Sequence, residues 1–196
     1  GYTYDAVLNV GTTAWYLALE RDFNPLWSQS ISYRTPNSQG IVTGIVTLEG
    51  RTDYTTQATF LVTLPNETTP IAYAPINDED KDKIGVQITL VSNGNYKLIN
   101  LPIGTYDISV KANGYLRETI EDIVINEDAY IENVDFGLLK AGDANNDNAV
   151  DAKDSTIVDN AMGSTPASPN WDERADINND EIVNTFDSNL ITTNLG

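Results

Sequence analysis

Two twelve-residue loops with nearly the same pattern lie 33 residues apart near the end of the sequence. The first runs from Asp143 to Asp154 and the second from Asp176 to Asp187, and each places side-chain oxygens at loop positions 1, 3, 5, 9 and 12. A loop of this length can wrap such oxygens around one calcium ion, which takes six to eight hard oxygen ligands, and position 7 adds its main-chain carbonyl. Because the pattern is repeated in register, the segment is predicted to hold two calcium ions.

The predicted ligands occupy equivalent positions in the two loops. They are Asp143, Asn145, Asp147, Ala149 (carbonyl), Asp151 and Asp154 in loop 1, and Asp176, Asn178, Asp180, Ile182 (carbonyl), Asn184 and Asp187 in loop 2. Position 6 is Asn148 in loop 1 and Glu181 in loop 2, and Glu tolerates a left-handed turn less readily than Asn. Loop 2 is therefore expected to be the more strained. Position 8 is apolar in both loops, Val150 and Val183, which predicts a short β-bridge between them.

Each loop leads into a helical pattern, over Asp154–Met162 and Asp187–Leu195, and Gly163 and Gly196 follow as helix ends. No helical pattern precedes either loop. This order of loop and then helix, over residues 141–196, resembles the dockerin family rather than a true EF-hand, which has a helix on both sides of the loop. This segment has eleven Asp or Glu against two Lys or Arg, so its folding is expected to depend on calcium.

The dockerin resemblance implies that the calcium-loaded module docks on a cohesin domain of another protein and so joins an enzyme or scaffold to an extracellular complex. It places the recognition residues at loop positions 10 and 11 and on the following helices. By position these are Ala152, Lys153, Asp159, Asn160, Thr185, Phe186, Thr192 and Thr193. Because the two copies differ at these positions, one face is predicted to dominate the docking.

Residues 41–139 consist of short segments rich in Val, Ile, Thr and Tyr that are separated by turn residues, which is typical of an all-β sandwich. Asn93-Gly94 favours a type I′ hairpin. Leu101-Pro102-Ile103-Gly104-Thr105-Tyr106 and Asn113-Gly114-Tyr115 resemble the carboxypeptidase regulatory-like family of prealbumin-type sandwiches, which implies a supporting role. The expected strands are Ile41–Leu48, Gln57–Leu64, Gly85–Val91, Tyr96–Asn100, Thr105–Ala112, Ile120–Ile125 and Tyr130–Phe136. A sandwich followed directly by a dockerin resembles the X-module–dockerin tandems of cellulosomes.

Residues 1–30 form a separate segment. Asp5 is a plausible N-cap, and apolar residues recur at helical spacing until Asn24-Pro25, which predicts one helix of about 16 residues. The run from Thr13 to Leu19, followed by Phe23–Trp27, resembles the closing helix of bacterial α/α-barrel carbohydrate-active enzymes. The alternative is a helix that docks on the sandwich. The polar residues 31–40 are expected to be a linker.

The amino-acid composition of the chain argues against several classes of function. The chain has a formal net charge of −18 and contains neither Cys nor His. The charge argues against nucleic-acid or anionic-membrane partners, and no apolar run is long enough to span a bilayer. The missing side chains exclude Ser-His-Asp and Cys-His catalysis and imidazole or thiolate zinc sites. No catalytic residue is predicted, although an enzyme could be appended.

The predicted fold is multidomain: an N-terminal helix, an all-β prealbumin-like sandwich, and a small α-helical dockerin with two EF-hand-like calcium loops. The predicted function is calcium-dependent, extracellular protein–protein docking by a module that is monomeric when unbound. Two alternatives remain open. The segment could be a calcium-stabilised carbohydrate-binding or adhesive tail, or it could be the C-terminal region of a glycoside hydrolase.

Overall fold

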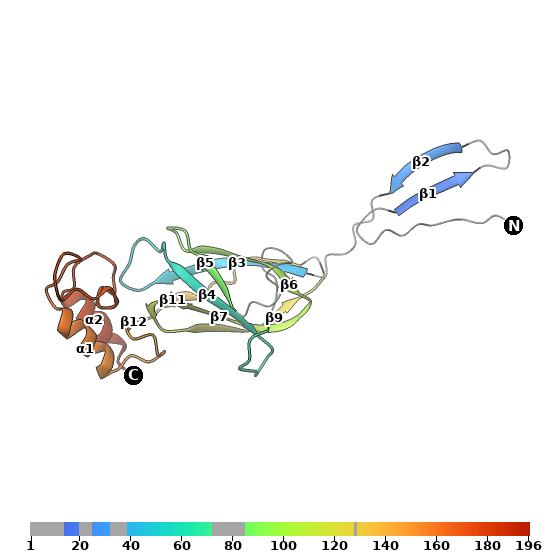
Figure 1. Ribbon diagram of the computed structural model, residues 1–196. Coiled ribbons are helices and arrows are strands. Elements are labelled where there is room, and N and C mark those ends of the chain that lie inside the picture. Colours follow the sequence, from blue (N-terminus) through green and yellow to red (C-terminus); the bar gives the residue numbers. More distant parts are fainter. Residues whose placement is uncertain (1–13, 20–24, 32–38, 72–84, 128) are drawn as a thin grey trace. The chain divides into compact units, whose positions relative to one another are not determined.

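The structure is a computed structural model that describes residues 14–19, 25–31, 39–71, 85–127 and 129–196. The chain divides into two compact units, Gly1–Ser38 and Gln39–Gly196. In the first unit, β1 (Ala14–Leu19) pairs antiparallel with β2 (Pro25–Ile31) (Figure 1). The predicted helix is therefore wrong over Ala14–Leu19, and its earlier part lies outside the described residues. A short apolar run fits a strand as well as a helix, and the aromatic residues in this run favour the strand.

The second unit begins with the predicted β-sandwich, which the structure confirms. Its first sheet has β3 (Gln39–Leu48) at the centre, antiparallel to β6 (Asn95–Pro102) and parallel to the short strands β10 (Tyr130–Ile131) and β11 (Gly137–Leu139). Its second sheet is antiparallel, in the order β5-β4-β7-β9. The bounds of these strands are β4 (Gln57–Thr63), β5 (Val86–Thr89), β7 (Gly104–Ala112) and β9 (Glu118–Ile125).

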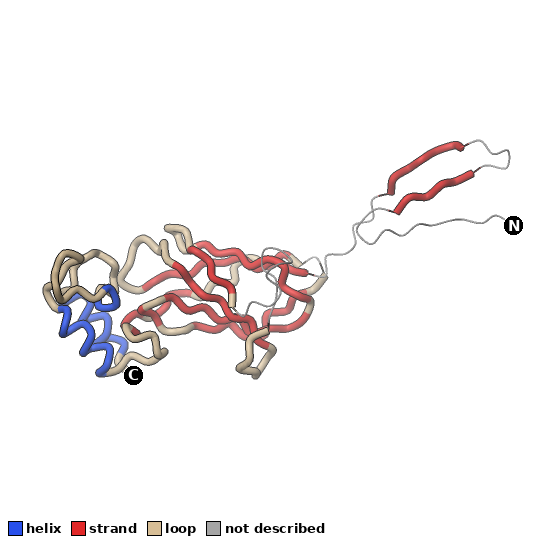
Figure 2. Tube along the Cα trace, viewed as in Figure 1, coloured by secondary structure: helices blue, strands red, loops and turns tan. Residues whose placement is uncertain are grey.

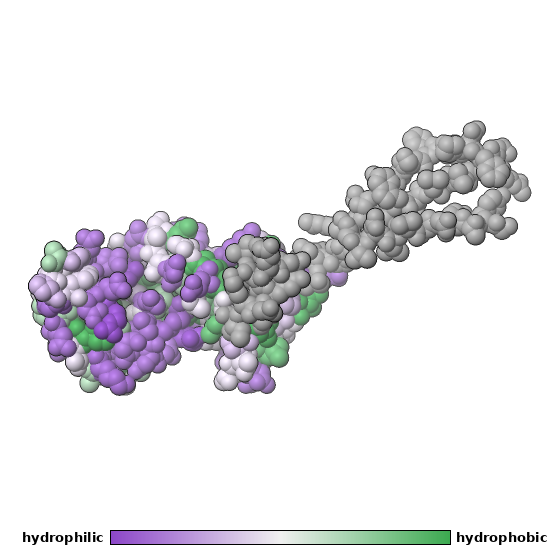
Figure 3. All heavy atoms as spheres, viewed as in Figure 1, coloured by the Kyte–Doolittle hydropathy of each residue, from purple (hydrophilic) through white to green (hydrophobic). Residues whose placement is uncertain are grey.

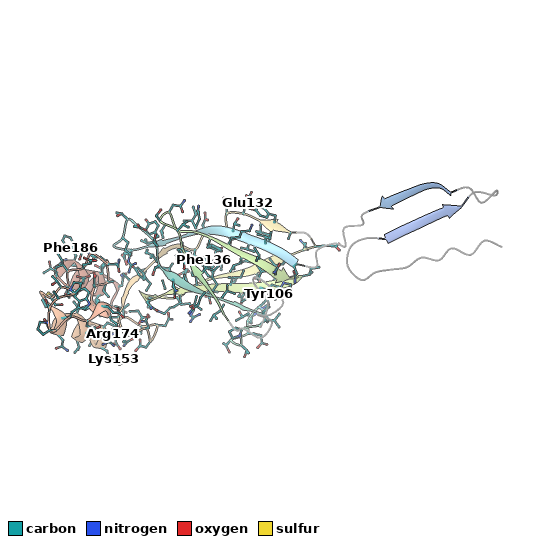
Figure 4. All side chains as sticks on the ribbon, turned by 45° about the horizontal axis from the view of Figure 1, so that its top comes forward. Tyr106, Glu132, Phe136, Lys153, Arg174 and Phe186 are labelled. Atoms are coloured by element: carbon teal, nitrogen blue, oxygen red, sulfur yellow. The ribbon has the colours of Figure 1, made fainter. Side chains whose placement is uncertain are left out.

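The sandwich core forms where the alternating inward side chains of the two sheets meet. On β4 these are Ala58, Phe60 and Val62, all of which are buried. Phe60 contacts Tyr96 of the facing sheet, with ring centroids 4.7 Å apart, and Phe136 packs against both rings at 5.9 and 5.6 Å. Figure 4 labels Phe136 inside the sandwich. The aromatic cluster thus joins the two sheets.

The Asn93-Gly94 turn does not close a hairpin, so that prediction is wrong. The strands on either side, β5 and β6, belong to different sheets, and Gly94 has a positive φ of 79° while Asn93 does not. A type I′ turn needs positive φ at both central residues. Glycine is required here for another reason as well, because a Cβ on Gly94 would lie 2.0 Å from the carbonyl oxygen of Val46.

The predicted strand Tyr130–Phe136 is also shorter than expected. Only Tyr130–Ile131 forms a strand, and pairing resumes at Gly137. Asn133 and Gly137 have positive φ values of 60° and 70°, which interrupt an extended chain. The segment still runs beside β3, since the amides of Val134 and Phe136 donate to carbonyls of that strand.

The helices of the second unit follow the sandwich, as predicted. They are α1 (Ala152–Ala161), the 3₁₀ helix η2 (Glu173–Ala175) and α2 (Thr185–Asn194), and Figure 2 shows both α-helices at the C-terminal end. Each α-helix begins two residues before its predicted start. Their buried residues, among them Val158, Ala161 and Ile191, belong to the same apolar cluster as the sandwich core. No helix in the described ranges is both long and apolar enough to cross a membrane.

Candidate calcium loops and their junction with the sandwich

Loop 1 is held in shape by its own side chains. The position 6 amide, Asn148 N, donates to Asp143 Oδ2 at 3.0 Å, and Asp147 N donates to Asn145 Oδ1 at 2.8 Å. Asp154 is fully buried and accepts from two main-chain amides, Asn145 N at 3.0 Å and Asp151 N at 2.8 Å. The position 12 carboxylate therefore links the end of the loop to its beginning, and the position 1 carboxylate holds the turn at position 6.

Loop 2 repeats these contacts position by position. Glu181 N donates to Asp176 Oδ2 at 2.9 Å, and Asp180 N donates to Asn178 Oδ1 at 3.1 Å. Asp187 is fully buried and accepts from the amides of Ile177, Asn178 and Asn184 at 2.8 to 3.3 Å. Burial raises the pKa of the Asp187 carboxyl, although these amides act in the opposite direction.

The two loops also share their backbone path. The residues at positions 4 and 6 have left-handed φ values of 61° and 67° in loop 1 and 60° and 67° in loop 2. These residues are Asn146, Asn148, Asn179 and Glu181. Positive φ at the same two positions gives both loops the same tight turn.

The residues at positions 9 and 12 have a second role at the helix ends. Asp151 caps α1 and Asn184 caps α2, and each forms a capping box with the Asp three residues later, Asp154 or Asp187. The side chains predicted to bind metal therefore also satisfy the first free amides of the helices. A change at these positions alters both the loop and the helix that follows it.

The predicted β-bridge between Val150 and Val183 is wrong. Val183 instead bonds through its main chain to Gly163 N at 2.8 Å and Ser164 O at 3.0 Å, and Val150 O accepts from Gly196 N at 3.4 Å. Each position 8 residue therefore contacts the end of the other copy's helix. The side chains of Val150 and Val183 are both buried.

The residue types present fit a calcium ion. Asp143 Oδ1 is buried without a hydrogen-bond partner in the described structure, so one acceptor at position 1 is free for a cation. Within the described ranges no three acidic side chains converge as a preformed metal cluster. Their oxygens bond instead to loop amides and to lysines. The hydrogen bond from Lys153, the leading cause, lowers the pKa of Asp147.

All eight residues predicted to contact a partner are exposed on α1 and α2. Phe186 is 69% exposed, which is unusual for a phenylalanine, and the side chain of its counterpart Lys153 is also 69% exposed. Figure 4 labels both at the helical end of the unit, and Figure 3 shows mainly hydrophilic residues on the visible face there. Met162 and Leu195, the last residues of the two predicted helices, are 39% and 51% exposed, and they follow the helices as C-cap residues.

The junction with the sandwich contains contacts that the sequence did not predict. β12 (Ala141–Asp143) pairs antiparallel with β8 (Gly114–Tyr115), so Asp143, the first predicted ligand of loop 1, lies on a strand that pairs with the sandwich. The buried Tyr115 places its hydroxyl 3.1 Å from Glu49 O and 3.3 Å from Ile177 O in loop 2. Glu49 Oε2 accepts from Asn194 Nδ2 at 2.5 Å. Of the sandwich residues at this junction, only Gly114 and Tyr115 belong to a motif singled out from the sequence.

Comparison with known proteins agrees with this geometry. The family described as dockerin type I domain matches residues 141–196. This segment is a dockerin type I domain. Dockerins of this type bind calcium. No curated protein matches the chain.

Solved structures share the fold of the dockerin and the preceding sandwich. Two crystal structures from Acetivibrio cellulolyticus, an N-terminal and a C-terminal interface mutant of a type II cohesin–X-dockerin complex, each match with a TM-score of 0.55. The identities are 17% and 18%, and each match covers 80% of this chain and 96% of the other. The sandwich and the dockerin of this chain, taken together, therefore share the fold of the X-dockerin in these two structures.

Proposed function

We propose that residues 141–196 bind two calcium ions and dock on a cohesin domain of another protein, while the sandwich over residues 41–139 supports the dockerin. The observation that carries the proposal is the pair of loops with matching hydrogen bonds and matching left-handed positions, each leading into a helix with exposed polar or aromatic residues at its start. The proposed ligands are the twelve groups predicted from the sequence.

The ligand proposal rests on the role of each atom in the loop. Position 1 directs one carboxylate oxygen to the position 6 amide in both loops, and in loop 1 the other oxygen is buried and free. Four Asp in loop 1 and three in loop 2 bring carboxylates together, so binding of a divalent cation would offset their repulsion. With a dissociation constant near micromolar in millimolar calcium, each site would add about 4 kcal/mol to stability.

Metal uptake is tested by calorimetry and native mass spectrometry of residues 39–196. The expected result is two calcium ions per chain, and one ion after Asp180→Ala, which removes a loop 2 ligand without touching the helix cap. Ser155→Ala is a control outside the ligand set. Failure to take up calcium in the parent chain would refute the proposed sites.

We further propose that α2 dominates the docking surface. Phe186 offers a large exposed aromatic side chain at the start of α2, whereas Lys153 at the same place on α1 makes ion pairs with Asp147 and Asp151 at 3.1 and 3.4 Å. Exposed aromatic residues are enriched among binding hot spots. Phe186→Ala is expected to cost at least 2 kcal/mol of binding, and Lys153→Ala less than 1 kcal/mol.

The docking test is calorimetry of the chain against a panel of type I and type II cohesins, with calcium and with chelator. Both types are needed because the family match is to type I and the structural likeness is to a type II complex. Binding that requires calcium is expected for at least one cohesin. Binding to insoluble polysaccharide with none to any cohesin would favour a carbohydrate-binding tail instead. Equal losses from Phe186→Ala and Lys153→Ala would contradict the dominance of α2.

The setting of the module follows from the same proposal. We propose an extracellular protein that is monomeric when unbound and is attached to a polysaccharide-degrading enzyme or a scaffold. The dockerin family is generally extracellular or on the cell surface, and millimolar external calcium suits sites of this class. Secretion of the parent protein, followed by fractionation of the culture, tests the location.

A further inference from the structure

A lysine of the sandwich reaches into the first calcium loop. Lys111 lies on β7, and its ammonium is 2.6 Å from Asp143 Oδ2. The side chain of Lys111 is only 13% exposed and that of Asp143 is fully buried. The same ammonium donates to the carbonyl of Tyr115 and lies 3.4 Å from Asn146 Oδ1. This ion pair is shielded from solvent, unlike the exposed pairs of Lys153.

The two oxygens of the Asp143 carboxylate therefore have different surroundings. Asp143 Oδ2 accepts from Lys111 and from Asn148 N, whereas Asp143 Oδ1 is buried and has no hydrogen-bond partner in the described structure. A calcium ion on Oδ1 would share this carboxylate with the ammonium on Oδ2. The two cations would repel each other at short range in a poorly solvated place.

The sandwich also holds two further residues of loop 1. The amide of Gly114 donates to Asn146 Oδ1 at 3.0 Å, and the amide of Arg117 donates to Asn148 Oδ1 at 2.7 Å. Asn146 and Asn148 are the two left-handed residues of the loop. Sandwich groups thus fasten positions 1, 4 and 6 of loop 1.

Loop 2 is held by the sandwich to a smaller extent. The equivalents of these three residues are Asp176, Asn179 and Glu181, and in the described structure no sandwich lysine pairs with Asp176 and no sandwich amide donates to the other two side chains. Among the described residues, the hydrogen bond from the sandwich to loop 2 runs from the Tyr115 hydroxyl to the carbonyl of Ile177, and Arg51 of the sandwich lines one pocket with Asp176 and Asn179.

We propose that Lys111 is a built-in counter-cation of loop 1, so that the sandwich holds loop 1 in its folded shape before calcium binds, whereas loop 2 depends on calcium for its shape. This inference rests on the calcium sites of the proposed function. Lys111 is a positioning residue, because it contacts the Asp143 carboxylate through Oδ2, whereas calcium would bind through the unpartnered Oδ1. Its charge lowers the calcium affinity of site 1 while it stabilises the calcium-free loop.

The first test isolates site 1 by placing every variant in an Asp180→Ala background. Calcium titration by calorimetry is expected to show that Lys111→Met tightens binding at site 1 by about tenfold, because a nearby positive charge is removed. Lys111→Arg, which keeps the charge, should remain within about twofold of the parent. Lys97→Met removes an exposed lysine on β6 and should change nothing. Unchanged or weaker binding in Lys111→Met overturns the proposal.

The second test needs no variant and therefore does not depend on how well Lys111→Met folds. Amide hydrogen exchange of the unaltered chain in chelator should show a protected Asn148 amide and an unprotected Glu181 amide, the two equivalent donors to position 1. Equal exchange in the two loops overturns the proposal. Where Lys111→Met folds, the Asn148 amide should lose its protection in chelator and regain it in calcium.

The two proposals fail in different ways. A parent chain that takes up no calcium refutes the calcium sites themselves. A parent chain that takes up two ions, with site 1 unaffected by Lys111→Met, refutes only the role of Lys111.

Discussion

Glu181 is a residue of loop 2 that does not suit its own backbone conformation. Its φ of 67° is the same as that of Asn148 in the other loop, but Asn and Gly tolerate this region far better than Glu. The side chain of Glu181 is exposed, so packing does not compensate for the cost. The greater strain of loop 2, predicted from the sequence, stays a prediction that substitution can test.

Glu181→Asn is expected to raise the free energy of unfolding by about 1 kcal/mol, because the backbone strain at this position is relieved. Chemical denaturation in saturating calcium measures the change. Glu67→Asn is the matched control, since it removes the same charge from an exposed residue that lacks a positive φ. A gain of the same size in the control would mean that charge, rather than backbone conformation, is responsible.

Tyr115 gives the junction a dependence on alkaline pH. Burial raises the pKa of its hydroxyl to about 12, with Glu49 and Asp176 adding to the effect and Arg51 opposing it. Since the folded pKa lies above the ordinary value of 10, the stabilisation from neutral Tyr115 is complete below pH 10. It is lost as the pH rises from 10 to 12.

The expected result is a fall in melting temperature between pH 10 and 12 that is smaller in Tyr115→Phe than in the parent. Phe cannot ionise, although it also loses the contacts to Glu49 O and Ile177 O, so its melting temperature at pH 8 should already be lower. Scanning calorimetry across this pH range makes the comparison. Parallel curves for the two proteins would show that Tyr115 does not contribute.

At the scale of elements, the two loop–helix units depend on single carboxylates. Asp187 receives three main-chain hydrogen bonds and closes the capping box of α2. Asp187→Ala leaves these buried amides without an acceptor, and we expect a loss of about 3 kcal/mol of stability in calcium and a smaller loss in chelator. Urea denaturation with and without calcium measures it. Ser188→Ala, one residue further along α2, should cost less than about 0.5 kcal/mol.

The sequence predicted those elements whose pattern is local. The loops, the two helices and most strands of the sandwich follow from spacing and periodicity. The prediction of an N-terminal helix failed because the short run Ala14–Leu19 fits both the helical and the strand periodicity. Its pairing with Pro25–Ile31 decides in favour of the strand. The prediction of a hairpin at Asn93-Gly94 failed because residues that favour a hairpin turn can also connect strands of two different sheets.

Contacts between distant residues were beyond the reach of the sequence. Lys111 and Asp143 are 32 positions apart, and Glu49 and Asn194 are 145 apart. Nothing in local composition marks either pair, because each forms only when the sandwich and the dockerin pack together. The candidate ligands could be named from the loop pattern, whereas the groups that hold loop 1 could not.

At the scale of the whole second unit, sandwich and dockerin share one apolar core. Asn194 at the end of α2 ties them further, since its side-chain amide donates to Glu49 Oε2 and to Ala141 O at 3.0 Å. Asn194→Ala is expected to lower the melting temperature by about 2–4 °C, equivalent to about 1 kcal/mol for a unit of this size. It should also broaden the single calorimetric transition. The exposed neighbour Thr193→Ala should leave the transition unchanged.

The parallel pairing of β3 with β11 determines how this unit would carry a mechanical load. β3 begins the unit at Gln39, and β11 leads through a single residue into β12 and the dockerin. Tension between a tether at Gln39 and a partner held by the dockerin would pull these two strands past one another along their length. Their hydrogen bonds would then be stretched together in shear rather than opened one at a time, so the strand that starts the sandwich and the strand that ends it would resist the pull as one.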